Sequence, residues 1–101
     1  MINFNSETKC EILYTTQFKK QIKKFIHQNK NLDDLLVVIN KLANLEELEP
    51  KYRNHSLIND KTYKNCKECH ISLNWLLIYK YIKNNLIPLL VSTSSHSELF
   101  D

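Results

Sequence analysis

The first half of the chain contains two stretches in which apolar residues recur at a helical spacing. In the first, Phe18, Ile22, Phe25 and Ile26 fall on one face, and Thr15 or Thr16 is placed to cap a helix that runs to about His27. In the second, Asn31 is placed to cap a helix whose buried stripe is Leu32, Leu35, Leu36, Ile39 and Leu42. The acidic stretch Glu46–Glu49 and Pro50 end this helix.

After Pro50 the spacing changes to that of strands. Cys69, Ile71 and Leu73 alternate with His70, Ser72 and Asn74, so the last three are expected to share a polar face. Asn84-Asn85 predicts a hairpin turn between the runs 75–83 and 86–93, and Pro88 indicates an edge position or a bulge. With a weak first strand at Glu11–Tyr14, the pattern predicts an α+β fold in a single domain, residues 1–101.

Composition excludes few classes of protein, but it bears on the partner and the cellular compartment that we expect. The chain has 101 residues and a formal net charge of +3, which allows an anionic partner without requiring one. Arg53 is the only arginine. The N-terminus lacks the pattern of a signal peptide, and the apolar runs are too short to span a bilayer, so we expect a cytoplasmic protein with no membrane partner. Three cysteines, an odd number, fit reduced thiols better than disulfides.

One short motif, Cys66-Lys67-Glu68-Cys69-His70, matches the spacing of a haem attachment site. Covalent haem belongs to exported proteins, the only methionine is Met1, and Cys69 and His70 fall on opposite faces of the expected strand. A structural zinc site needs a second pair of ligands, which the chain does not provide. We therefore expect no metal or cofactor and interpret Cys69 as a small core residue.

Three histidines of the C-terminal half, His55, His70 and His96, are candidates for acid–base chemistry, because imidazole titrates near neutrality. A lone histidine on a polar face is usually a surface residue, which is how we interpret His27. The lysines of the first helix, Lys19, Lys20, Lys23 and Lys24, form either a solvated face or a binding face for RNA backbone. Trp75 and Phe100 are either structural aromatics or platforms for an unpaired base.

At these same residues the chain resembles the YafQ-like branch of the RelE toxin superfamily. The stretch from Glu68-Cys69-His70 to Trp75 and Tyr79 resembles the family's histidine-bearing strand and the tryptophan strand that follows it. Ser95-His96-Ser97-Glu98-Leu99-Phe100 resembles the family's C-terminal ending, and Glu49–Leu57 resembles its segment around an earlier histidine. Thr16–Lys20 resembles the start of its first helix.

The resemblance implies a fold of two N-terminal helices packed on a small, twisted, mainly antiparallel β-sheet. It implies a type II toxin that cleaves mRNA on the ribosome and is held inactive by a cognate antitoxin. His55, His70 and His96 match the family's catalytic positions, and Trp75 and Phe100 match the rim of its active site. Two positions depart from the family: Asn74 replaces an acid and Ser92 replaces an arginine.

The implied chemistry is metal-independent attack of a ribose 2′-hydroxyl on the adjacent phosphorus, with inhibition of translation as the outcome. It needs a base, an acid and positive charge for the phosphorane oxygens. Asn74 can orient an imidazole without ionising, Glu68 has the right facing to substitute in part, and Arg53 can supply charge from the His55 segment. We therefore expect a weaker nuclease whose cleavage rises with Ser92→Arg and Asn74→Asp. The alternative is a toxin-like protein that binds its antitoxin, and the ribosome or operator DNA complex, without cleaving RNA.

Overall fold

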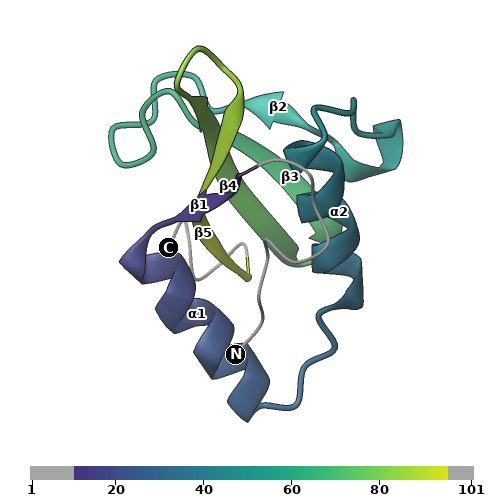
Figure 1. Ribbon diagram of the computed structural model, residues 1–101. Coiled ribbons are helices and arrows are strands. Elements are labelled where there is room, and N and C mark those ends of the chain that lie inside the picture. The colour runs from purple at the N-terminus through teal and green to yellow at the C-terminus, as the bar shows by residue number, and fades with distance from the viewer. Residues whose placement is uncertain (1–10, 96–101) are drawn as a thin grey trace.

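The computed structural model describes residues 11–95, in which two helices pack on one face of a five-stranded sheet (Figure 1). The strand order is β1-β5-β4-β3-β2, and only the β1–β5 pair is parallel. The elements are β1 (Leu13–Tyr14), α1 (Thr16–His27), α2 (Asp33–Ala43), the 3-10 helix η1 (Pro50–Tyr52), β2 (His55–Ser56), β3 (Lys67–Ser72), β4 (Trp75–Ile82) and β5 (Ile87–Ser95). This confirms the predicted α+β fold. No helix within the described range is long and apolar enough to cross a membrane.

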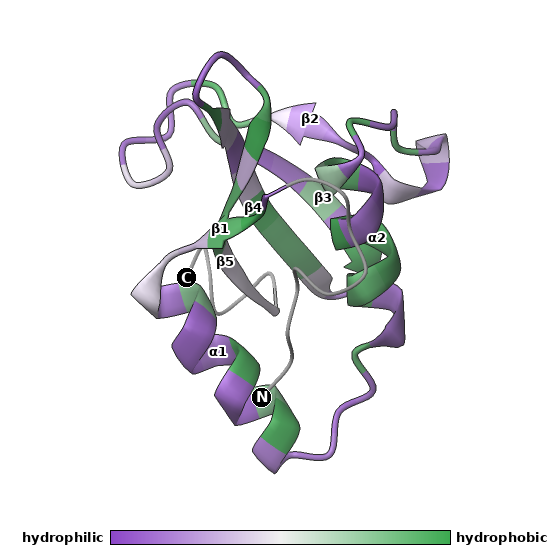
Figure 2. Cartoon of the chain, viewed as in Figure 1, coloured by the Kyte–Doolittle hydropathy of each residue, from purple (hydrophilic) through white to green (hydrophobic). Residues whose placement is uncertain are grey.

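The first helix, α1, begins and ends close to the predicted limits. Thr15 caps it, because its hydroxyl accepts a hydrogen bond from the backbone N–H of Phe18. Phe18, Ile22 and Phe25 are buried, whereas Ile26 is 42% exposed, so the apolar face is narrower than predicted. The four lysines of the polar face are exposed, and Figure 2 shows the two sides of α1 in contrasting colours.

The second helix, α2, is shorter than the sequence predicted at both ends. Leu32, not Asn31, occupies the N-cap position, but the Asn31 side chain accepts a hydrogen bond from the N–H of Asp33, the first residue of the helix. The helix ends at Ala43, ahead of the acidic stretch, and the Asn44 side chain donates to the carbonyl of Asn40. Val38 and Ala43 join the buried stripe, while Leu36 is only half-buried. Leu45 then takes a positive φ, and the N–H of Glu46 donates to the carbonyl of Lys41, so a left-handed cap ends the helix before the proline is reached.

The turn between β3 and β4 corrects the predicted polar face. Ser72 pairs with Trp75, which leaves Leu73 and Asn74 as a two-residue turn. Asn74 therefore does not extend the face of His70, and Leu73 is 86% exposed rather than buried. A register shift between His70 and Ser72 accompanies the turn.

The hairpin between β4 and β5 turns at the predicted place without glycine. Lys83, Asn84 and Asn85 all take positive φ, a conformation that asparagine tolerates better than most residues. Pro88 pairs with Tyr81 and lies beside, rather than within, the short pairing of β1 with β5. The irregularity itself occurs at Val91, because Tyr79 pairs with Leu90 and Ile78 with Ser92.

The sheet is buried on both faces. Cys69, Leu77, Tyr79 and Leu90 belong to the core beneath the helices, and Ile78 belongs to a smaller cluster with Tyr63 and Cys66 on the other side. Cys69 is thus a core residue, as predicted, and Cys66 is buried in the smaller cluster. Burial raises the pKa of the Cys69 thiol to about 12 and also raises that of Cys66, so both remain protonated and apolar at neutral pH.

Candidate active site

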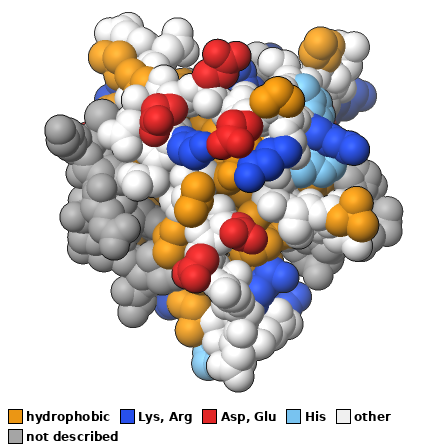
Figure 3. Space-filling model, turned by 90° about the vertical axis from the view of Figure 1, so that its right-hand side faces the viewer, with side chains coloured by type: hydrophobic (Ala, Val, Ile, Leu, Met, Phe, Trp, Pro, Cys, Tyr) orange, Lys and Arg blue, Asp and Glu red, His pale blue; other side chains and the backbone are white. Residues whose placement is uncertain are grey.

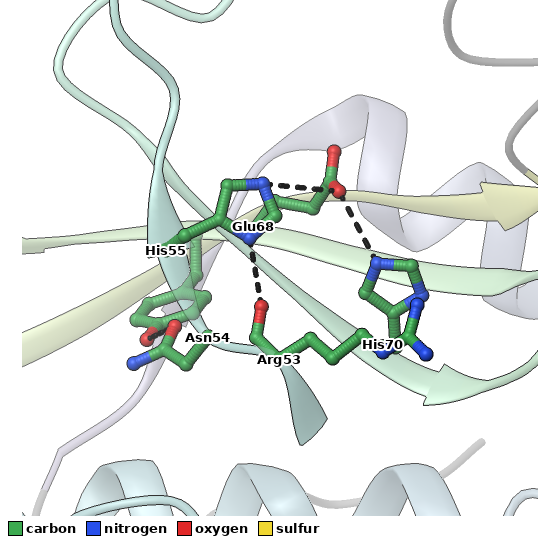
Figure 4. Close-up of polar contacts among 6 residues, drawn as sticks. Arg53, Asn54, His55, Glu68 and His70 are labelled. Carbon is green, nitrogen blue, oxygen red and sulfur yellow. Dashed lines mark hydrogen bonds and ion pairs between the residues drawn. The ribbon is translucent and has the colours of Figure 1, made fainter. Parts of the chain in front are cut away.

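A buried carboxylate lies between two imidazole rings on the sheet face opposite the helices. β2 pairs with β3 so that His55 stands opposite Glu68, and strand alternation puts His70 on the same side as Glu68. Glu68 Oε1 lies 3.5 Å from Nε2 of His55 and 3.6 Å from Nε2 of His70 (Figure 4). The ring centroids of the two histidines are 6.5 Å apart. We call these three residues the His–Glu–His cluster.

The three side chains of the His–Glu–His cluster differ in how far they are exposed to solvent. The side chain of Glu68 is 6% exposed, that of His70 23% and that of His55 51%. His55 Nδ1 lies 2.7 Å from the carbonyl oxygen of Arg53. Because a carbonyl only accepts, we assign the proton to Nδ1, which leaves Nε2 facing the carboxylate. When either ring is protonated, it forms an ion pair with Glu68 in a partly desolvated setting.

The segment that carries His55 is fixed to the body of the protein by its neighbours. Tyr52 is buried, and the next residue, Arg53, takes a left-handed conformation with φ 48° and ψ 43°. The Arg53 N–H donates to the carbonyl of Pro50 at 3.0 Å. The Tyr79 hydroxyl, from the centre of β4, donates to Asn54 Oδ1 at 2.6 Å. These contacts hold β2 at the edge of the sheet although β2 has only two residues.

A pocket of about 340 Å³ opens beside His70. It is lined by the start of α2, the η1 segment and the end of β3, with side chains from Asp34, Lys51, Tyr52, Arg53, His70, Ile71, Ser72 and Leu73. Figure 3 shows histidine and basic side chains next to one another on the face of the molecule that it presents. The pocket therefore combines positive charge with an imidazole from the cluster.

Several residues predicted for the site lie elsewhere. Trp75 belongs to the core under the helices, packs edge-on against Phe25 and donates from Nε1 to Thr93 Oγ1. With 7% exposure it does not offer an open face for a base. Helix α1 packs beside β5, toward the other edge of the sheet from β2 and β3, and its four lysines are exposed. These lysines therefore do not join the histidines.

The two positions that depart from the family pattern also lie outside the cluster. Asn74 is in the β3–β4 turn. Ser92 is fully buried, and its hydroxyl makes hydrogen bonds with the side chains of Gln17 and Gln21 on α1. An arginine would not fit at Ser92 without displacing these glutamines. His96 and Phe100 lie outside the described residues.

Other residues of the site were not anticipated from the sequence. Asn54 and Tyr79 form the hydrogen bond that holds the His55 segment, and Asp34 and Lys51 line the pocket. Asp34 gave no signal, because an acid in the first turn of a helix is ordinary. Lys51 and Asn54 adjoin Arg53 and His55, so proximity in sequence was the one available sign.

Two helices packed on one face of a five-stranded, mainly antiparallel sheet are the fold of the RelE-like toxins. The family model described as the bacterial toxin of a type II toxin–antitoxin system, YafQ, matches residues 10–101. This chain therefore belongs to the YafQ toxin family.

Solved structures of related toxins agree with this assignment. A metal-bound toxin from Helicobacter pylori is 34% identical, with 90% of this chain and 99% of that chain covered and a TM-score of 0.78. YafQ from E. coli is 26% identical, with coverage of 92% and 100% and a TM-score of 0.78. The E. coli DinJ–YafQ complex matches with the same identity and coverage and a TM-score of 0.77. No curated protein sequence matches this chain.

Proposed function

We propose that this toxin is a ribosome-dependent endoribonuclease that cleaves mRNA by histidine acid–base catalysis without a metal. The observation that carries the proposal is the His–Glu–His cluster, in which two imidazoles share one buried carboxylate. Two imidazoles close together can supply both a base and an acid in one reaction. The pocket beside His70 provides space for a nucleotide next to them.

In the proposed reaction, a neutral imidazole takes the proton of a ribose 2′-hydroxyl as its oxygen attacks the adjacent phosphorus. The bond from phosphorus to the 5′-oxygen of the next nucleotide breaks, and an imidazolium donates a proton to that oxygen. The products are a 2′,3′-cyclic phosphate and a free 5′-hydroxyl. His55, His70 and His96 are the candidates for these two roles, and Glu68 orients the first two.

We also propose a cognate antitoxin as the physiological partner and the cytoplasm, where ribosomes are, as the place of action. Support for the antitoxin comes from E. coli YafQ, whose structure has been solved in complex with DinJ. A small toxin with an exposed, mildly basic surface also suits an acidic partner.

The test is cleavage of a defined mRNA on programmed ribosomes by the wild type and by His55→Ala, His70→Ala and His96→Ala. Each variant should cut at least about 100-fold more slowly, because acid–base groups contribute roughly that much or more. His27→Ala, on exposed α1 surface, is the matched control and should cut at the wild-type rate. Full activity in all three histidine variants would refute the proposal.

The same assay should also test for a metal requirement, because the Helicobacter pylori relatives were solved with bound metal and, for one mutant, with bound copper. Within residues 11–95, no three or more His, Cys, Asp or Glu side chains, those of the His–Glu–His cluster included, are arranged so that they could hold a metal ion. We expect a chelator to leave cleavage unchanged. Loss of activity with a chelator and recovery with added copper would replace the metal-independent mechanism.

A second candidate function is antitoxin and ribosome binding without cleavage. It is favoured by the positions of Asn74, in a turn, and Ser92, held by two glutamines, since neither supplies the group that the family pattern would place there. Growth arrest on induced expression, abolished by His70→Ala, supports the nuclease. Harmless expression with retained antitoxin binding supports this second function.

A further inference from the structure

The reaction needs a fixed positive charge, and the described part of the chain offers few cations near the cluster. The phosphate of RNA is anionic, and its charge grows more concentrated on the phosphorane oxygens during attack. Position 92 carries a serine that is buried and bonded to Gln17 and Gln21, so β5 supplies no cation there. The basic side chains that line the pocket beside His70 are Lys51 and Arg53.

Of these two cations, Lys51 is already engaged. Its Nζ lies 4.0 Å from Glu49 Oε2 and 5.1 Å from the centre of the Tyr52 ring. Arg53 differs, because within residues 11–95 its guanidinium takes part in no ion pair. Its side chain is exposed and extends toward His70, and both residues line the same pocket (Figure 4).

The backbone of Arg53 is held from two sides, which fixes the origin of this side chain. Its N–H donates to Pro50, and its carbonyl accepts the hydrogen bond from His55 Nδ1. A guanidinium presents a planar fork of N–H donors that matches two phosphate oxygens at once. Arg53 therefore combines a fixed position, an unpaired charge and the geometry that phosphate recognition requires.

We propose that Arg53 binds the phosphate group of RNA in the pocket beside His70, an inference that rests on the proposed nuclease function. Asp34 lines the same pocket and repels an anion, so the phosphate lies between Arg53 and His70, away from the start of α2. The nucleoside attached to that phosphate then extends toward Asp34, whose carboxylate accepts hydrogen bonds from base or ribose donors. The substrate class of the pocket is thus a nucleotide of single-stranded RNA with its phosphate at the histidines.

The experiment measures binding and cleavage on the same proteins. Inorganic phosphate is titrated into wild type, Arg53→Gln, Arg53→Lys and Asp34→Asn, and the side-chain NMR signals of His70 report the site. Wild type should show saturable shifts at His70. Arg53→Gln should lose them, Arg53→Lys should keep them in weaker form, and Asp34→Asn should bind more tightly. Lys83→Gln, an exposed charge change in the β4–β5 turn, is the control and should bind as wild type does.

On programmed ribosomes, Arg53→Gln should cut about 100-fold more slowly, the lower end of the loss for one pre-organised donor, with partial recovery in Arg53→Lys. Unchanged phosphate shifts at His70 in Arg53→Gln would overturn the inference, even if cleavage fell, because the Arg53 side chain would then affect a step other than phosphate binding beside His70. Arg53-dependent phosphate binding by a wild type that never cleaves RNA would overturn the proposed function and leave this phosphate site standing.

Discussion

Among the single residues of the site, Glu68 has the most demanding position. A carboxylate with a side chain 6% exposed needs compensation for lost hydration, and the two imidazole nitrogens near its Oε1 provide it when protonated. The same contact fixes the directions in which both rings point. Glu68 thus bears both on the stability of this face of the sheet and on the orientation of the two histidines that are proposed to act in catalysis.

Glu68→Gln tests this connection, because an amide keeps the shape and removes the charge. We expect kcat on programmed ribosomes to fall about 100-fold with KM unchanged, since the substrate pocket is intact while the imidazoles lose their orienting anion. Glu46→Gln, which removes an exposed acid that does not line the pocket, is the control. A wild-type kcat for Glu68→Gln would remove Glu68 from the mechanism.

Cys69 leads to a prediction about alkaline pH. In the fold its pKa is about 12, against an ordinary value of 9.0, because burial disfavours the thiolate. As the pH rises, the unfolded chain therefore loses this proton first. The contribution of Cys69 to the free energy of unfolding is fully present below pH 9 and falls between about pH 9 and 12, by about 1.4 kcal/mol per pH unit.

The measurement is urea unfolding from pH 8 to 11, with Cys69→Ala beside the wild type. Burial also raises the pKa of Tyr79 and Tyr81, so part of the slope remains in the variant. The variant is less stable throughout, because it leaves a cavity, and the comparison is therefore between slopes rather than absolute values. Identical slopes in the two proteins would contradict the prediction.

At the scale of elements, helix α1 covers the core and also makes hydrogen bonds to the part of β5 that follows its short pairing with β1. Among residues 11–95, β1 pairs only with Leu89 and Leu90, so no described strand lies on that side of the later part of β5. Thr15 Oγ1 donates to the carbonyl of Val91, and Gln21 Oε1 accepts from the N–H of Thr93. A helix thus provides the hydrogen bonds that an edge strand lacks.

Gln21→Ala should therefore cost more than an ordinary surface substitution. It leaves the N–H of Thr93 and the hydroxyl of buried Ser92 without their best partner, a loss of about 1–3 kcal/mol in the free energy of unfolding. Gln17→Ala is the matched control, because Gln17 makes a single, longer contact of 3.3 Å to Ser92. Equal losses for both variants in urea unfolding would show that Gln21 has no special role at the edge.

The same elements show what the sequence could and could not predict. Helix α1 and the β4–β5 hairpin follow from local signals, a threonine cap with periodic apolar residues and an asparagine pair. Asn74 was misplaced because strand alternation was extended through a turn that no glycine marks. The approach of His55 to Glu68 depends on the register of β2 against β3, which is set by long-range contacts such as Tyr79 with Asn54.

Among the described residues, two groups of basic side chains bear on the proposed function. Lys51 and Arg53 lie at the pocket near β3, and the four lysines of α1 lie on the helix beside β5, toward the opposite edge of the sheet. In the first group, Arg53 is the residue proposed to bind the phosphate. The second group lies on a helix that packs beside β5 rather than β3, and we propose that it attracts the densely charged RNA surface of the ribosome in a general way.

Replacing Lys19, Lys20, Lys23 and Lys24 by glutamine tests this division of roles. We expect weaker association with ribosomes and a salt dependence reduced by about 1–3 in the slope of log K against log salt, since each lost phosphate contact lowers that slope by about 0.7–0.9. Phosphate binding at His70 should be unchanged. The matched variant replaces four exposed lysines elsewhere, Lys61, Lys64, Lys67 and Lys83, and so has the same net charge. Equal weakening in both variants would mean that α1 is simply a solvated face and that net charge alone attracts the ribosome.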